Sequence, residues 1–345
     1  MAVISQATAP PSANDARPWN LVRLLTGSPS DLGGRGFGIG AVSCLGLLAC
    51  LFRDSLGNFY HHWRIDENYS HGFLVPLISL YFANLVARRG PVPIRGGTWL
   101  GGLMLLGALL VRLLTVPLPI WFLADLAFLI GLTGGFTILF GTPALRRYWF
   151  AFFFLVFMVP LPVALYSRIA SPLQLLASRV ASTVMNASGV PVLCEGNKMT
   201  LPGGVQMFVA EACSGMRQLT GFLALTAAVA YLSARPAWYR AVIVVSALPI
   251  ALTANIARVV LTGYIMHFVN PQYASGTFHT LEGLLMMGFG LLLLQSECWV
   301  MDWIGGLEND PRACATQRGP GEGRLELDKE GPCRDFSVSC SAARS

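Results

Sequence analysis

Long apolar runs alternate with short polar connections over most of this chain. Each run is close to the roughly 20 residues that a helix needs to cross the hydrocarbon of a bilayer. The pattern predicts an all-α polytopic membrane protein with about eight transmembrane helices, the first two of them short. We place these spans at residues 37–52, 72–87, 98–115, 119–140, 148–166, 215–233, 239–268 and 280–300.

Composition supports this fold class. Hydrophobic residues make up 54% of the 345 residues, charged residues only 12%, and the mean hydropathy is +0.57. A soluble domain is not this apolar. The net charge of +6 does not indicate nucleic-acid binding, because the arginines stand singly or in pairs between apolar runs instead of sharing one polar face.

The basic residues predict the topology instead. Cytoplasmic connections carry an excess of Lys and Arg, which places both termini inside and the connections 53–71, 116–118, 167–214 and 269–279 outside. The arginines that set this orientation are Arg17, Arg23, Arg35, Arg88, Arg89, Arg95, Arg146, Arg147, Arg235 and Arg240.

Three regions are expected along the chain. Residues 1–36 form a polar cytoplasmic segment with no basic start followed by an apolar core, so a cleaved signal peptide is not expected. Residues 37–304 form one membrane domain without an internal repeat. Residues 305–345 are rich in Gly, Pro and Arg, have few large apolar residues, and are predicted to be a flexible cytoplasmic tail.

The long outer segment should contain two kinds of structure. Residues 171–188 have helical periodicity typical of a helix at the membrane interface, ended by Gly189 and Pro191. Residues 190–209 read as short extended pieces separated by turns that contain glycine. We predict a small extracytoplasmic β-hairpin there, just before the span at 215–233.

Cys213 is the most reactive candidate among the eight cysteines. The set has no CxxC pair and no zinc-like spacing, and no metal or cofactor is expected. Cys213 follows Glu211, precedes Ser214 at the start of a predicted helix, and has Arg217 one turn further on. A helix N-terminus and a nearby cation favour the nucleophilic thiolate. The alternative is a small packing residue, which these polar neighbours make less favourable.

Arg258 and His279 belong at the same boundary as Cys213. A helix that starts inside near Arg240 reaches the outer interface close to Arg258, and the last span starts outside at His279. Arg258, with Asn255 one turn before it, lies in an apolar run where a charge needs a partner or a water-filled cavity. The alternatives are an arginine that snorkels and an ordinary interfacial histidine.

His71 is a further candidate at the outer mouth. It ends the polar run Glu67-Asn68-Tyr69-Ser70-His71 at the head of the span 72–87. It either binds substrate or caps the helix.

These motifs resemble the exosortase family. The resemblance rests on Glu-Ala-Cys-Ser-Gly-x-Arg leading into a span, Asn-x-x-Arg in the next span and a histidine at the head of the one after. Tyr69-Ser70-His71-Gly72 and the run Leu201-Pro202-Gly203-Gly204 also resemble that family's pattern, and the resemblance covers roughly residues 40–300.

The resemblance implies a cysteine transpeptidase of Gram-negative inner membranes. Such enzymes process proteins that bear a C-terminal Pro-Glu-Pro (PEP-CTERM) sorting signal with a transmembrane helix, at the periplasmic face, in systems linked to exopolysaccharide production. Cys213 would be the nucleophile, Arg258 the essential arginine and His279 the third catalytic residue. Expected substrate-binding residues are Arg217, His71, Glu211, Ser214 and Asn255. Membrane lipids surround the enzyme, and the acyl acceptor and any pairing of Cys194 stay open.

Two other classes of protein fit the polytopic pattern. A transporter or flippase for a polysaccharide precursor would use Arg258 to hold a phosphate and would not need Cys213. A scaffold for an envelope complex would depend on the tail and tolerate changes at all three candidate catalytic residues.

Overall fold

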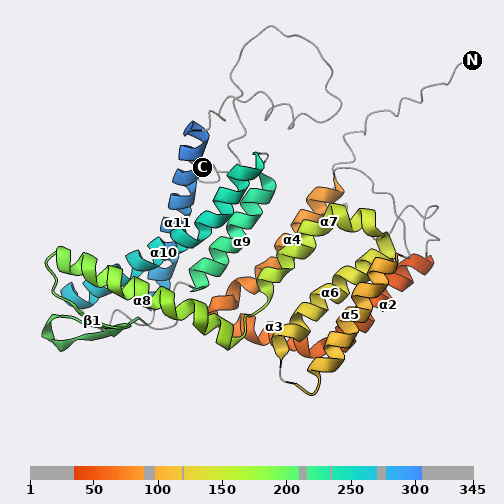
Figure 1. Ribbon diagram of the computed structural model, residues 1–345, viewed down its shortest axis with the longest axis horizontal. Coiled ribbons are helices and arrows are strands. Elements are labelled where there is room, and N and C mark those ends of the chain that lie inside the picture. Colours follow the sequence, from red (N-terminus) through yellow and green to blue (C-terminus); the bar gives the residue numbers. More distant parts are fainter. Residues whose placement is uncertain are drawn as a thin grey trace, which may run out of the picture. The chain divides into compact units, whose positions relative to one another are not determined.

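The computed structural model describes residues 35–88, 98–118, 120–209, 216–233, 235–269 and 277–304. They are almost entirely helical and fall into two compact units (Figure 1). The first unit contains the described residues up to His62 together with Gly72–Pro160. The second contains Trp63–His71 and the described residues from Leu161 onward.

The first unit is a set of helices. They are α2 (Arg35–Leu51), α3 (Arg53–Ile65, whose last residues belong to the second unit), α4 (Leu74–Ala87), α5 (Trp99–Thr115), α6 (Trp121–Phe140), α7 (Thr142–Phe154) and the 3₁₀ turn η3 (Leu155–Met158). Helices α5 and α6 pack closely at two glycines, because a Cβ atom on Gly101 would lie 2.9 Å from the carbonyl oxygen of Gly134. Small residues allow such close backbone contact between membrane helices.

Helix α3 occupies part of the segment 53–71, which the sequence pattern treats as a connection. Asp54 lies in its first turn, where a negative charge suits the helix dipole. Phe59 is buried, and Asn58 Nδ2 donates a 2.7 Å hydrogen bond to Oδ2 of the fully buried Asp125 on α6. The helix is therefore held by tertiary contacts that its low hydropathy does not reveal.

The second unit combines helices with a small sheet. Its elements are part of the 3₁₀ helix η2 (Glu67–Phe73), then α8 (Val163–Ala187), β1 (Leu193–Glu195), β2 (Lys198–Thr200), η4 (Pro202–Gly204), β3 (Gln206–Phe208), α9 (Met216–Leu232), α10 (Ala237–Phe268) and α11 (Thr277–Ile304). Helix α10 packs against α8, α9 and α11, and Figure 1 shows α9, α10 and α11 side by side.

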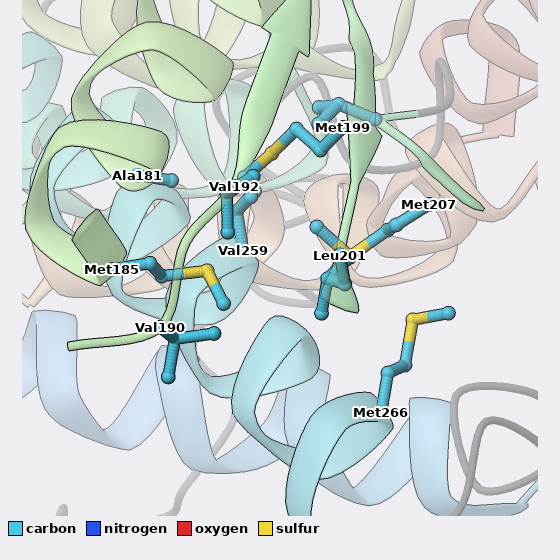
Figure 2. Close-up of a cluster of buried hydrophobic side chains, with 10 residues drawn as sticks. Ala181, Met185, Val190, Val192, Met199, Leu201, Met207, Val259 and Met266 are labelled. Atoms are coloured by element: carbon cyan, nitrogen blue, oxygen red, sulfur yellow. The ribbon is translucent and has the colours of Figure 1, made fainter. Parts of the chain in front are cut away.

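The segment predicted to form a hairpin contains three antiparallel strands in the order β1-β2-β3. Gly196, with φ +66°, supplies the left-handed residue of the turn between β1 and β2. One face of the sheet packs on helices: Met199 and Met207 join a buried cluster with Met185 of α8 and Val259 of α10 (Figure 2). The sheet is thus attached to the helix that carries Arg258.

The span predicted at 148–166 is not one continuous helix. The chain leaves helical structure after Met158 and starts α8 at Val163, earlier than the predicted start at residue 171. Pro160 and Pro162 cause the break, because a proline has no N–H to donate and its ring clashes with the preceding turn.

Four helices among the described residues are long and apolar enough to cross a membrane. They are Asn68–Ala87, Trp121–Phe140, Ala237–Phe268 and Gly283–Ile304, and the number rises to six if each of two bent helix pairs forms one span. These helices support a multi-pass all-α membrane protein. The figure of eight spans stays a prediction.

Candidate functional site

Arg258 is buried in the C-terminal half of the long apolar helix α10. It is 3% exposed, and Asn255, one turn before it on α10, is fully buried. Thr262, one turn after it, donates its hydroxyl to the Arg258 carbonyl at 2.9 Å. A buried guanidinium is costly in an apolar helix, which makes Arg258 a candidate functional residue. The burial excludes an arginine that snorkels into water.

Arg217 lies in the first turn of α9, near Arg258. The positive charge of Arg258 acts unfavourably on Arg217, and the negative charge of Asp66 acts favourably. Arg217 is half-buried, so solvent screens these charges only in part. Two guanidinium groups close enough to interact electrostatically favour a bound anion or a developing negative charge.

The polar segment 63–71 joins this neighbourhood. Asp66 Oδ1 accepts hydrogen bonds from the backbone N–H and the side-chain amide of Asn68, both at 2.9 Å. The buried Tyr69 accepts the N–H of Leu161 on its hydroxyl oxygen at 2.9 Å, and its ring lies 6.5 Å from that of His71. The structure therefore places His71 in the same unit as Arg217 and Arg258.

Buried contacts fix the start of α9 on α8. Met216, 1% exposed, packs with Tyr166 and Ala170 of α8 and with Leu161 just before that helix. Leu161 is also the residue that donates to Tyr69. The position of Arg217, the next residue after Met216, is thus set by the packing that also holds the segment 63–71.

The other expected site residues are only partly described. Cys213, Glu211 and Ser214 lie in the segment 210–215, outside the described residues. The backbone of His279 lies in the first turn of α11, and its side chain is outside the description. Within the described part of the chain, no group of three or more His, Cys, Asp and Glu side chains could hold a metal ion.

Two residues of this region were not predicted from the sequence. Asp66 acts electrostatically on Arg217 from a distant part of the chain, and nothing in its local sequence indicates that interaction. Gln218 follows Arg217 and is 3% exposed, and neither polar atom of its side chain has a hydrogen-bond partner among the described residues. The sequence signal available for Gln218 was a second polar residue beside Arg217 in the predicted span.

A family comparison now identifies the chain. Residues 63–296, more than half of its length, match the family model described as transmembrane exosortase. The chain belongs to this family. Exosortases are membrane-embedded enzymes that act on proteins bearing sorting signals. A search of curated proteins and a search of solved structures give no match.

The matched residues include every candidate position. They begin at the polar segment that carries Asp66 and His71 and end within α11, beyond His279. The exosortase match therefore covers the whole second unit up to the last part of α11, and the resemblance seen in the motifs is confirmed at the level of the family.

Proposed function

We propose that this exosortase is a cysteine transpeptidase that removes the C-terminal sorting signal of exported proteins, a Pro-Glu-Pro motif followed by a transmembrane helix. The reaction would proceed through a thioester on Cys213, at the periplasmic face of the inner membrane, in envelope and exopolysaccharide biogenesis. The observation that carries the proposal is the proximity of Arg217 and Arg258 to the two ends of the segment that contains Cys213. Arg217 follows Met216, where that segment ends, and Arg258 precedes Val259, which packs in one cluster with Val209, where the segment starts.

Chain connectivity limits where Cys213 can lie. The segment 210–215 starts after Val209, which is buried in the same cluster as Val259, the neighbour of Arg258. It ends before Met216, the neighbour of Arg217. At ~3.3–3.6 Å per residue, Cys213 is within about 15 Å of Val209 and about 11 Å of Met216. This bound supports a reaction in which the thiol and both arginines act on one substrate.

Helix geometry supports a role for His279. Helices α10 and α11 run antiparallel, and the Tyr239 hydroxyl donates to the carbonyl oxygen of Cys298 at 3.5 Å. Arg258 lies as many residues beyond Tyr239 as His279 lies before Cys298. With a rise of ~1.5 Å per residue, both are about 28 Å from that contact. These equal counts support our proposal that His279 and Arg258 act at one level of the helix pair.

In the proposed reaction, the Cys213 thiolate attacks the carbonyl carbon of a peptide bond near the Pro-Glu-Pro motif. The carbon–sulfur bond forms, the carbon–nitrogen bond breaks, and the transmembrane tail leaves as an amine that His279 protonates. Arg258 stabilises the oxyanion of the tetrahedral intermediate. Arg217, His71, Glu211, Ser214 and Asn255 hold the substrate.

A second nucleophile then resolves the thioester. An amine or hydroxyl of a lipid or glycan would give transfer, and water would give proteolysis. In either case the thioester carbon–sulfur bond breaks and the Cys213 thiolate is restored.

A transporter or flippase for a polysaccharide precursor is the second candidate. The two neighbouring arginines would suit a lipid-linked phosphate as well as they suit an oxyanion. This hypothesis gives Cys213 no role.

The deciding experiment follows the processing of a membrane-anchored Pro-Glu-Pro substrate in cells, by gel shift and mass spectrometry. Wild type is compared with Cys213→Ala and with Cys50→Ala, which changes an exposed cysteine in the first unit. We expect tail removal to stop only with Cys213→Ala. Unchanged processing in that variant would exclude the transpeptidase hypothesis and favour the transporter hypothesis.

A further inference from the structure

Strand β3 is the last strand of the sheet, and its backbone has one edge that pairs with no other strand among the described residues. Val209 donates its N–H to Asn197 and Leu201 donates to Val205, both at 2.8 Å, so residues 205, 207 and 209 direct their backbone groups toward β2. Alternate residues of an antiparallel strand point the other way. The N–H and C=O groups of Gln206 and Phe208 therefore point to the outer edge.

A positive charge lies beside this edge. Lys198 of β2 is the register partner of Phe208, and its ammonium nitrogen lies 5.9 Å from the centre of the Phe208 ring. Phe208 is 59% exposed, on the face of the sheet opposite to the buried Met207. The lysine side chain thus leans over β3 in the direction of the unpaired edge.

We propose that the Pro-Glu-Pro segment of the substrate binds to the β3 edge as an additional strand, with its glutamate opposite Phe208 and in ionic contact with Lys198. This inference rests on the proposed function, which supplies the motif. Addition of a peptide to an exposed sheet edge is a common mode of recognition, in which backbone bonds give affinity and alternate side chains give specificity.

The Pro-Glu-Pro sequence suits an edge of this kind. A proline has no N–H, so it is tolerated in an edge strand only where its nitrogen faces away from the sheet. When the glutamate exchanges both backbone bonds with Phe208, the two prolines face away, because orientation alternates along the strand. Directly opposite residues share a face, which puts the glutamate side chain with Phe208 and Lys198.

The other edge of the sheet suits this substrate less well. The register places Leu193 and Glu195 in bonded pairs with β2, which leaves only Cys194 to direct its backbone groups outward from β1. Glu195 is exposed there and would repel an acidic peptide. Strand β3 also ends only five residues before Cys213 in the sequence.

A charge exchange tests the ionic contact. Lys198→Glu should lower kcat/KM for a Pro-Glu-Pro substrate by about tenfold, through loss of one ion pair and gain of one repulsion. A Pro-Lys-Pro substrate should restore cleavage by this variant, and Lys198→Arg should keep cleavage near wild type. Arg179→Glu, an exposed change of equal charge on α8, is the control and should have no such effect. The proposal is overturned if the Pro-Lys-Pro substrate does not restore cleavage by Lys198→Glu, or if it restores cleavage by Arg217→Glu instead.

A backbone substitution tests the strand pairing independently. Gln206→Pro removes an outward N–H and no bond between β2 and β3, whereas Gln206→Ala keeps that N–H. We expect Gln206→Pro to raise KM while kcat is retained, and Gln206→Ala to match wild type. Equal KM values for Gln206→Pro and Gln206→Ala would exclude β3 as the docking edge.

Alkylation of Cys213 by iodoacetamide separates recognition from chemistry. Its rate should be unchanged in Lys198→Glu and Gln206→Pro, since neither change touches the thiol. If Cys213→Ala leaves processing intact, the proposed function itself fails. If Cys213→Ala stops processing while the charge exchange and the proline have no effect, only the docking proposal fails.

Discussion

Arg217, in the first turn of α9, and Arg258, in the C-terminal half of α10, are like charges that act on one another. The charge of Arg258 acts on Arg217, and Asp66 acts on it with the opposite sign. Like charges in a partly buried place repel and cost free energy. Such an arrangement is useful where negative charge binds or develops, as in the tetrahedral intermediate of acyl transfer.

Arg258→Ala should therefore slow cleavage strongly. Removal of one oxyanion donor typically lowers the rate by about 10²–10³. The cleavage rate of Arg258→Lys should lie between those of Arg258→Ala and wild type, because lysine keeps the charge but lacks the planar set of donors. Single-turnover cleavage in proteoliposomes measures the effect. Arg240→Ala, an exposed change on the same helix, is the control. A rate for Arg258→Ala within about twofold of wild type would exclude the oxyanion role.

Arg217 should act on the nucleophile. A nearby cation favours the thiolate, so Arg217→Gln should slow alkylation of Cys213 by iodoacetamide at neutral pH, and Arg240→Gln should not. Mass spectrometry of the modified peptide reports Cys213 separately from the other cysteines. Equal alkylation rates in the two variants would show that Arg217 does not activate the thiol.

Hydropathy predicted the helices better than it predicted their ends. Helix α10, expected at 239–268, is found at Ala237–Phe268, because one continuous apolar run leaves little choice. The run at 148–166 is equally apolar but is interrupted after Met158. Hydropathy counts side chains, whereas Pro160 and Pro162 act on backbone hydrogen bonds, so the break does not appear in the apolar pattern.

The sequence could predict the candidate site only as far as the predicted topology sets how close each residue lies to a membrane boundary. Counting ~1.5 Å per residue from the inner end of α10 placed Arg258 near one boundary, and the same count relates it to His279. The electrostatic attraction between Asp66 and Arg217 and the hydrogen bond of Tyr69 to Leu161 join segments far apart in sequence. Their residue types do not specify a partner, so only the folded chain reveals these pairs.

Tyr69→Phe should loosen the segment that carries His71. The change removes the acceptor of the Leu161 N–H, and loss of one such bond costs roughly 0.5–1.5 kcal/mol, or more when the donor stays buried. Thermal unfolding in detergent should show a lower midpoint than wild type. Tyr60→Phe, at a side chain that is 55% exposed, should leave the midpoint unchanged. The same loss in both variants would mean that the Leu161 bond does not hold the segment.

Two glycines on α11 should respond in opposite ways to alanine. A Cβ atom on Gly290 would overlap the ring of Phe222 on α9, so the ring or the helix must move. Overpacking of this kind costs about 1–3 kcal/mol. A Cβ atom on Gly288 meets no atom within 4 Å, and alanine there should stabilise the helix by up to ~1 kcal/mol. Thermal unfolding in detergent distinguishes the two substitutions, and Phe222→Leu should relieve Gly290→Ala in the double variant. Equal stability of the two alanine variants would show that α9 and α11 do not pack at Gly290.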